Sequence, residues 1–126
     1  MLVYLQRKIK KSIMFKVAIV GGENIGDYKK YAEKCVYYLR NRTKDGITIL
    51  SMGDKFNDVF ASAANIDIKQ YNVDWGRFGK NALKNRQTQM IEECDAVIAF
   101  RDGTKETDCF ISLAKNANIP TRVVEI

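Results

Sequence analysis

The sequence predicts an α/β fold in which a doubly wound, mainly parallel sheet of about five strands has helices on both faces. The stretches Val17–Val20 and Ala96–Phe100 are continuously apolar, which is typical of strands that are buried on both faces. Stretches with helical periodicity separate the predicted strands, and polar turns rich in glycine, threonine and acidic residues follow several of them. Strands that alternate with helices form parallel sheets covered by helices, so we expect a three-layer, Rossmann-like architecture.

The length and composition are those of a single folded domain. The chain has 126 residues, of which 46% are hydrophobic and 29% charged, as in ordinary globular proteins. No apolar run approaches the ~20 residues that span a membrane, so we expect no membrane partner. The cysteine usage described below suits a cytoplasmic protein. Residues 14–126 are expected to form the domain, and residues 1–13 a basic N-terminal arm or extension.

The cysteine and histidine content limits the chemistry. The three cysteines lack metal-ligand spacing, so we expect buried thiols in a reducing compartment and no metal site. The chain contains no histidine, which excludes Ser-His-Asp catalysis, Cys-His catalysis and imidazole metal sites. Chemistry on this chain therefore depends on carboxylates, lysine, arginine, tyrosine or backbone groups.

The first half of the chain predicts two strand–helix units. The stretch Phe15–Asp27 begins with a β-branched apolar run, breaks at two adjacent glycines, and leads into helical periodicity that starts near Asp27. Because free N–H groups at the start of a helix favour anions, this loop is a candidate phosphate site. A second strand at Gly46–Leu50 leads through residues 51–54 into a short apolar helix at residues 56–64.

A third strand is expected at Ile66–Val73, and the segment Asn72–Asn81 that follows it combines aromatic, cationic and amide groups. Trp75, Lys80 and Asn81 suit stacking on a base and pairing with a phosphate. In the alternative interpretation Trp75 covers the core, as tryptophan often does.

A helix at Lys80–Cys94 places Arg86 one turn before Met90, so the arginine points toward the protein. An inward arginine needs an anionic partner, which is either a carboxylate of this chain or the phosphate or carboxylate of a ligand. Arg86 is therefore either one half of a structural ion pair or a ligand-binding residue.

The last strand–helix–strand unit begins at Ala96–Phe100 and ends with a strand at Thr121–Glu125. The helix between them starts after a polar turn, with Thr104 or Thr107 as its N-cap. The chain's only proline, Pro120, follows this helix and stops it.

Ligands in such folds bind beyond the carboxyl ends of the strands, near the point where strand order reverses. The two most apolar strands form the natural central pair, so the loops Gly21–Asn24 and Asp102–Thr107 are expected to face each other across a crevice. The candidate ligand-binding residues come from the loops after the strands and from the inward arginine. They are Gly21, Gly22, Glu23, Asn24, Ser51, Gly53, Asp54, Trp75, Lys80, Asn81, Arg86, Asp102, Gly103, Thr104 and Thr107.

Four motifs follow one another along the chain: Lys-Val-Ala-Ile-Val-Gly-Gly, Ile-Thr-Ile-Leu-Ser-Met-Gly-Asp, Asp-Trp-Gly-Arg-Phe-Gly-Lys-Asn-Ala and Asp-Ala-Val-Ile-Ala-Phe-Arg-Asp-Gly-Thr. In this order they resemble the small, single-domain YspA-like members of the SLOG superfamily. Those proteins are Rossmann-like and related to the DprA core and to LOG-type, cytokinin-activating phosphoribohydrolases. The resemblance covers Phe15–Val124.

The sequence departs from this family pattern in its loops and in one helix. Three larger residues stand where small ones are usual: Met52, Asp54 and Phe56. Gln87 replaces an asparagine, and Glu106 replaces a glycine beside the matching Thr107. Bulkier and acidic residues hinder the approach of a phosphate to backbone N–H groups. The departures therefore predict either a changed ligand preference or a loss of binding.

The resemblance implies a homo-oligomer that recognises a nucleotide or a nucleotide-derived ligand, such as an ADP-ribose-like or NAD-like molecule or a signalling nucleotide. A binding module that senses or sequesters this ligand is the first interpretation. Some relatives hydrolyse N-glycosidic bonds, so a phosphoribohydrolase-like N-glycosidase is the alternative. That chemistry needs a carboxylate near the ribose, and Glu106, Asp102 and Glu23 are the catalytic candidates.

A third interpretation, association with nucleic acid, depends on charge alone. The net charge of +6 permits it. The basic residues are spread along the chain, however, and the sequence has no nucleic-acid motif. Nucleic acid is therefore not the favoured partner.

Overall fold

The computed structural model describes residues 14–101 and 103–126, so the predicted N-terminal arm at residues 1–13 lies outside the described residues. The described part of the chain contains a five-stranded sheet in which every pairing is parallel and the strand order is β3-β2-β1-β4-β5. The strands are β1 (Phe15–Val20), β2 (Ile47–Ser51), β3 (Asp67–Gln70), β4 (Ala96–Arg101) and β5 (Thr121–Glu125).

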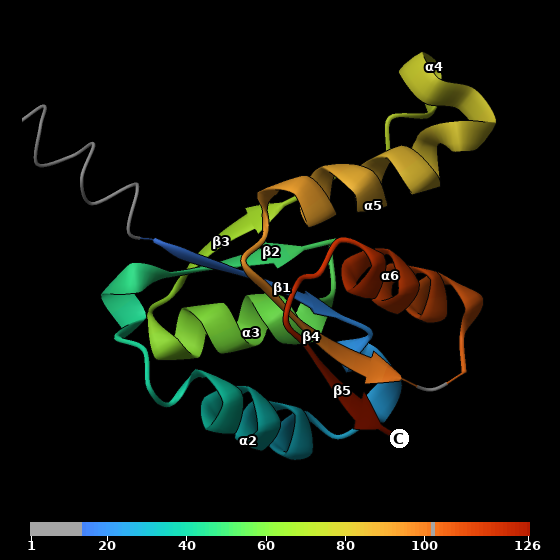
Figure 1. Ribbon diagram of the computed structural model, residues 1–126. Coiled ribbons are helices and arrows are strands. Elements are labelled where there is room, and N and C mark those ends of the chain that lie inside the picture. The colour runs from blue at the N-terminus through green and yellow to red at the C-terminus, as the bar shows by residue number, and fades with distance from the viewer. Residues whose placement is uncertain (1–13, 102) are drawn as a thin grey trace, which may run out of the picture.

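Helices cover both faces of the sheet. They are α2 (Tyr28–Leu39), α3 (Lys55–Ala64), α4 (Trp75–Phe78), α5 (Ala82–Glu93) and α6 (Lys105–Asn116), with 3-10 turns η1 (Gly22–Ile25), η2 (Lys44–Gly46) and η3 (Gly79–Asn81). Figure 1 shows α2 and α3 on one face and α5 and α6 on the other. The predicted three-layer, doubly wound α/β architecture is therefore confirmed. None of the described helices is long and apolar enough to cross a membrane.

The central position of β1 explains its continuous apolar sequence. Val17 and Ile19 belong to the core cluster formed with α2 and α3, whereas Ala18 and Val20 belong to the cluster formed with α5 and α6. Successive side chains of a strand point to opposite faces, so a strand covered on both faces must be apolar throughout. The predicted pairing of β1 with β4 is also confirmed, since Val17 lies opposite Ala96 in the register.

Both predicted helix starts have the expected residue at the N-cap position, but only that of α2 has a side-chain cap hydrogen bond. Asp27 is the N-cap of α2, and its carboxylate accepts a hydrogen bond of 3.3 Å from the backbone N–H of Lys30. Of the two candidates for α6, Thr104 occupies the N-cap position, and its hydroxyl donates to that of Thr107 over 3.1 Å.

The third strand is shorter than expected. It spans Asp67–Gln70 and not Ile66–Val73, and all four of its residues are exposed. β3 lies at the edge of the sheet and pairs with β2 alone. An edge strand has a neighbour on one side only, so polar–apolar alternation in the sequence did not define where its pairing ends.

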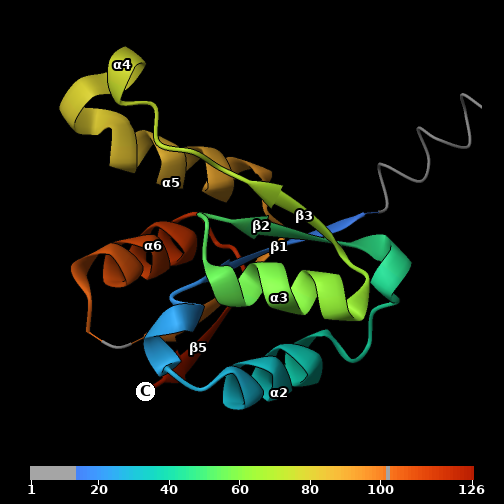
Figure 2. The same ribbon diagram turned by 180° about the vertical axis from the view of Figure 1, so that it is seen from behind.

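Trp75 does not cover the core, so that alternative interpretation was wrong. The residue is 56% exposed and opens α4, which stands off from the sheet beside the first turn of α5 (Figure 2). Asp74 begins this short helix by accepting a hydrogen bond of 3.0 Å from the backbone N–H of Arg77.

A buried asparagine connects the layer formed by α2 and α3 to the sheet. Asn57 is fully buried, and its side-chain amide donates to the carbonyl oxygen of Ile19 over 2.9 Å and to the Ser51 hydroxyl over 3.1 Å. Its side-chain oxygen accepts a hydrogen bond from the hydroxyl of Tyr31. One side chain of α3 therefore joins α2, β1 and β2 through polar contacts inside the core.

The cysteines give a first testable prediction. The expected burial of the thiols is confirmed for Cys35 and Cys94 and was wrong for Cys109, which is exposed. Burial raises the pKa of the Cys35 thiol to about 12 and that of Cys94 to about 11. Because the thiolate is the reactive form, one thiol per native chain should react rapidly with Ellman's reagent at pH 8, and all three should react in denaturant. Cys109→Ser should remove the rapid phase. Two or more rapid thiols in the native chain would contradict the burial of Cys35 and Cys94.

Candidate functional site

A cavity of about 280 Å³ lies at the carboxyl edge of the sheet, where the strand order reverses between β1 and β4. Its walls come from the loops after β1, β2 and β4 and from α5. The predicted loops Gly21–Asn24 and Asp102–Thr107 therefore do face each other, although Asp102 itself lies outside the described residues. The predicted ligand-binding residues that line the cavity are Gly21, Glu23, Asn24, Gly53, Asp54, Arg86, Thr104 and Thr107, and the catalytic candidate Glu106 lies beside them.

Two predicted residues lie behind the cavity wall instead. Ser51 is fully buried, and its hydroxyl oxygen accepts hydrogen bonds from the backbone N–H of Gly53 over 3.1 Å and from Asn57. Gly22 is buried against the ring of Tyr31, which would lie 2.6 Å from an added Cβ atom. Both residues shape the binding loops without presenting a side chain to the cavity.

Four other predicted residues lie away from the cavity. Lys80 and Gly103 line a shallow hollow between α5 and α6, and Asn81 is exposed at the start of α5. Trp75 lines a separate hollow of about 620 Å³ formed by α4, the loop before it and the first turns of α5. Arg86 lines both this hollow and the cavity, so the two spaces adjoin at the arginine.

The loops after β1 and β2 are held together by their own carboxylates. Asp54 accepts hydrogen bonds of 2.9 Å from the backbone N–H groups of Glu23 and Phe56. The carboxylate of Glu23 in turn accepts a hydrogen bond from the backbone N–H of Lys55, the first residue of α3. Burial raises the pKa of Asp54, while the two N–H groups that donate to it act in the opposite direction. The N-terminus of α3 is thus already capped by acidic groups of this chain.

Arg86 points inward, as the sequence predicted, and its partner is a carboxylate of the same chain. Its Nη2 atom lies 2.9 Å from Oε1 of Glu106, and the side chains of Arg86 and Glu106 are 11% and 47% exposed, respectively. The Nε atom of Arg86 is buried and has no hydrogen-bond partner among the described residues. The amide of Gln87 donates to the backbone carbonyl of Glu106 over 3.2 Å and fixes the first turn of α6.

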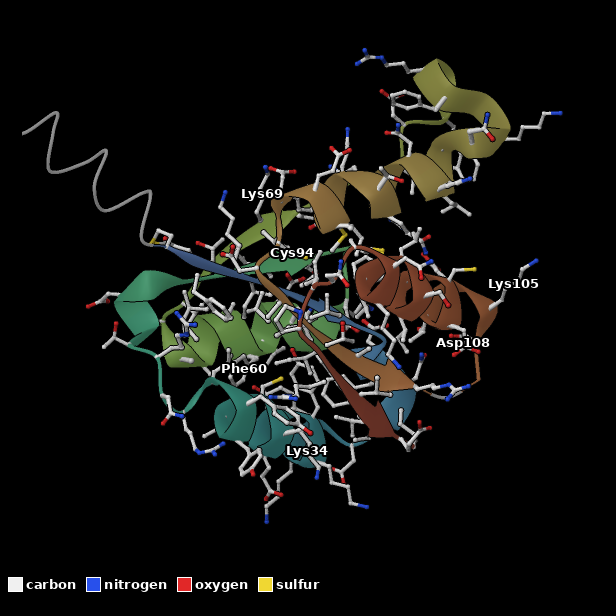
Figure 3. The ribbon with its side chains drawn as sticks, in the orientation of Figure 1. Lys34, Phe60, Lys69, Cys94, Lys105 and Asp108 are labelled. Atoms are coloured by element: carbon white, nitrogen blue, oxygen red, sulfur yellow. The ribbon has the colours of Figure 1, made fainter. Side chains whose placement is uncertain are left out.

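The cavity is acidic although the chain is basic. Glu23, Asp54 and Glu106 line it, and Arg86 is its one cationic side chain among the described residues. The lysines labelled in Figure 3 lie on α2, β3 and α6, and none of them lines the cavity; they are Lys34, Lys69 and Lys105. The net charge of +6 therefore does not describe the field inside the cavity.

The described residues contain no group of three or more histidine, cysteine, aspartate or glutamate side chains able to hold a metal ion. Polar recognition in the cavity therefore depends on the guanidinium of Arg86, the amide of Asn24, the hydroxyls of Thr104 and Thr107, and the carboxylates. Each of the three carboxylates already has a partner, either a backbone N–H group or Arg86.

Sequence reasoning missed Asn57, Asn85 and Gln89. Asn57 lies three and four residues before Phe60 and Ala61, which are buried on the same helix, and this spacing could have placed it on the buried face. Asn85 and Gln89 line the Trp75 hollow, and no local motif distinguishes them from solvent-facing amides of a helix.

Comparison of the chain with models of known protein families, with curated proteins and with solved structures found no match.

Proposed function

We propose that this chain binds a nucleotide or a nucleotide-derived ligand at the carboxyl edge of its sheet, as a sensor or a sequestering module. One observation carries the proposal: Arg86, with a side chain 11% exposed, separates a small polar cavity from a larger hollow that contains a tryptophan. A nucleotide has the matching division into a sugar phosphate and a flat aromatic base. The resemblance of the four motifs to YspA-like SLOG proteins points in the same direction.

The two spaces suit the two parts of such a ligand. A cavity of about 280 Å³ is near the lower limit of roughly 300 Å³ for small-molecule sites, so it would hold a sugar phosphate but not a whole nucleotide. Arg86 supplies the cation for the phosphate, and Thr104, Thr107 and Asn24 supply partners for sugar hydroxyls. The base would lie over Trp75, where stacking is effective for every base.

The position of Trp75 allows a direct binding test. It is the chain's single tryptophan, so its fluorescence reports on anything that stacks against it. We expect ADP-ribose, NAD or AMP to change this fluorescence and to raise the melting temperature, because a ligand at 100 times its Kd stabilises a protein by about 2.7 kcal/mol. Arg86→Ala should abolish both responses.

A matched control is Arg122→Ala, which removes an exposed arginine of β5 that does not line the cavity. This variant should bind as the original chain does. Trp75→Ala should weaken the binding of nucleotides and leave that of ribose 5-phosphate unchanged. A complete lack of response across a broad nucleotide panel would refute the binding function.

Hydrolysis of an N-glycosidic bond remains the alternative function. For Glu23 or Glu106 to act as a free base or acid, the carboxylate would have to leave its present partner, since both are engaged. The third candidate, Asp102, lies outside the described residues. Binding does not require any carboxylate to act as a free base or acid, and for this reason we place it first. The homo-oligomeric state and the cytoplasmic location stay predictions.

A further inference from the structure

The cavity has two groups that could bind an anion, and a carboxylate of this chain already contacts each of them. Glu23 lies at the N-terminus of α3, where it accepts a hydrogen bond from the N–H of Lys55. Glu106 lies on Arg86, with 2.9 Å between Nη2 and Oε1. Helix N-termini and arginine side chains are common binding groups for phosphates in proteins. A phosphate that enters this cavity therefore meets groups that are already occupied.

The two members of the Arg86–Glu106 pair differ in their freedom to move. Arg86 is largely enclosed, with 11% of its side chain exposed, whereas 47% of the Glu106 side chain is exposed. Glu106 is the second residue of α6, and Gln87 holds its backbone carbonyl over 3.2 Å. The carboxylate can therefore swing into solvent while the backbone of Glu106 and the arginine stay in place.

The contact between the two residues is incomplete. One hydrogen bond joins the two side chains. The buried Nε atom of Arg86 has no hydrogen-bond partner among the described residues. A carboxylate that paired with Arg86 as a two-pronged fork would satisfy more of the guanidinium. A phosphate has three acceptor oxygens and can accept more than one hydrogen bond from the guanidinium.

We infer that the carboxylate of Glu106 competes with a ligand phosphate for Arg86. This competition sets the preference of the cavity between phosphorylated and unphosphorylated ligands. The inference rests on the proposed nucleotide-binding function. A ligand phosphate gains Arg86 only after Glu106 has left, so the apparent affinity is reduced by the fraction of molecules in which the pair is formed. A nucleoside or free sugar does not need Arg86 and is not penalised.

The test compares two charge-neutralising substitutions on the same helix turn. Glu106→Gln removes the competing charge and keeps the size of the side chain. Asp108→Asn makes the same change in net charge and also breaks an ion pair, with Arg101 at 2.9 Å, but Asp108 does not line the cavity. Binding of ribose 5-phosphate, AMP and adenosine is measured by calorimetry on the full chain and on each variant.

We expect Glu106→Gln to bind ribose 5-phosphate and AMP about tenfold more tightly than the original chain, as removal of a partly buried ion-pair competitor implies. Asp108→Asn should match the original chain, and adenosine should bind all three proteins equally. The inference is overturned if Glu106→Gln binds phosphorylated ligands no more tightly, or if Asp108→Asn produces the same gain.

The two possible failures are distinguishable. If the original chain binds AMP and Glu106→Gln brings no gain, the competitor role is wrong and the nucleotide-binding function stands. If neither protein binds any member of the series, including inorganic phosphate at millimolar concentration, both are wrong. Circular dichroism of Glu106→Gln confirms that the helix is retained, and Glu106→Asp, which shortens the reach to Arg86, repeats the test without a change of charge.

Discussion

Replacing Asn57 with alanine is expected to lower the free energy of unfolding by about 3 kcal/mol or more, because buried polar groups that lose their partners cost about 1–3 kcal/mol each. Inside the core, Asn57 makes hydrogen bonds with the Tyr31 hydroxyl and the Ile19 carbonyl, and the substitution removes both of these hydrogen bonds. It also removes a contact to Ser51, whose hydroxyl holds the loop after β2. The effect should therefore reach the cavity as well as the core.

The measurement is urea unfolding followed by circular dichroism. Asn116→Ala is the matched control, because Asn116 ends α6 and is exposed. Both substitutions raise helix propensity, so their difference isolates the buried contacts of Asn57. If the two variants unfold at similar urea concentrations, the polar contacts of Asn57 do not hold the two layers together.

The fold could be predicted from the sequence because its central strands carry a strong local signal. Val17–Val20 and Ala96–Phe100 are apolar at every position, and in the structure both faces of these strands are buried. Asp27 marked the start of α2 by its capping chemistry. The end of β3 could not be predicted, because an edge strand ends where its pairing ends, and its own residues, all exposed, do not record that position.

The candidate site could be predicted in part for a geometric reason. The carboxyl ends of neighbouring parallel strands meet at one edge, so loops that follow β1 and β4 had to converge. The inward direction of Arg86 followed from its distance to Met90 along the helix. The partner of Arg86 could not be predicted, because Glu106 is 20 residues away in sequence and several loop carboxylates were equally suited to pair with it. Pairing between loops depends on tertiary geometry that no local motif encodes.

The second large effect is expected at Gly21, the first residue after β1. Gly21 has a φ of 74°, in the left-handed region, and a Cβ atom added there would lie 2.4 Å from the carbonyl oxygen of Phe100 on the neighbouring strand β4. Side chains in this backbone region cost about 1 kcal/mol, and overpacking against a backbone atom adds about 1–3 kcal/mol. Gly21→Ala should therefore destabilise the chain by about 3 kcal/mol and displace the loop that lines the cavity.

Gly26→Ala separates the two causes, because Gly26 has a similar φ of 68° and an added Cβ atom there meets no atom within 4 Å. For this variant the free energy of unfolding should fall only by the conformational cost of the left-handed backbone, about 1 kcal/mol. Thermal unfolding of both variants, with and without AMP, is the measurement. Gly21→Ala should also lose the response to AMP, and Gly26→Ala should keep it, because Gly21 lines the cavity and Gly26 does not. Equal destabilisation of the two variants would mean that the loop after β1 can move away from Phe100 at little cost. The close contact between Gly21 and Phe100 would then not define the shape of the cavity.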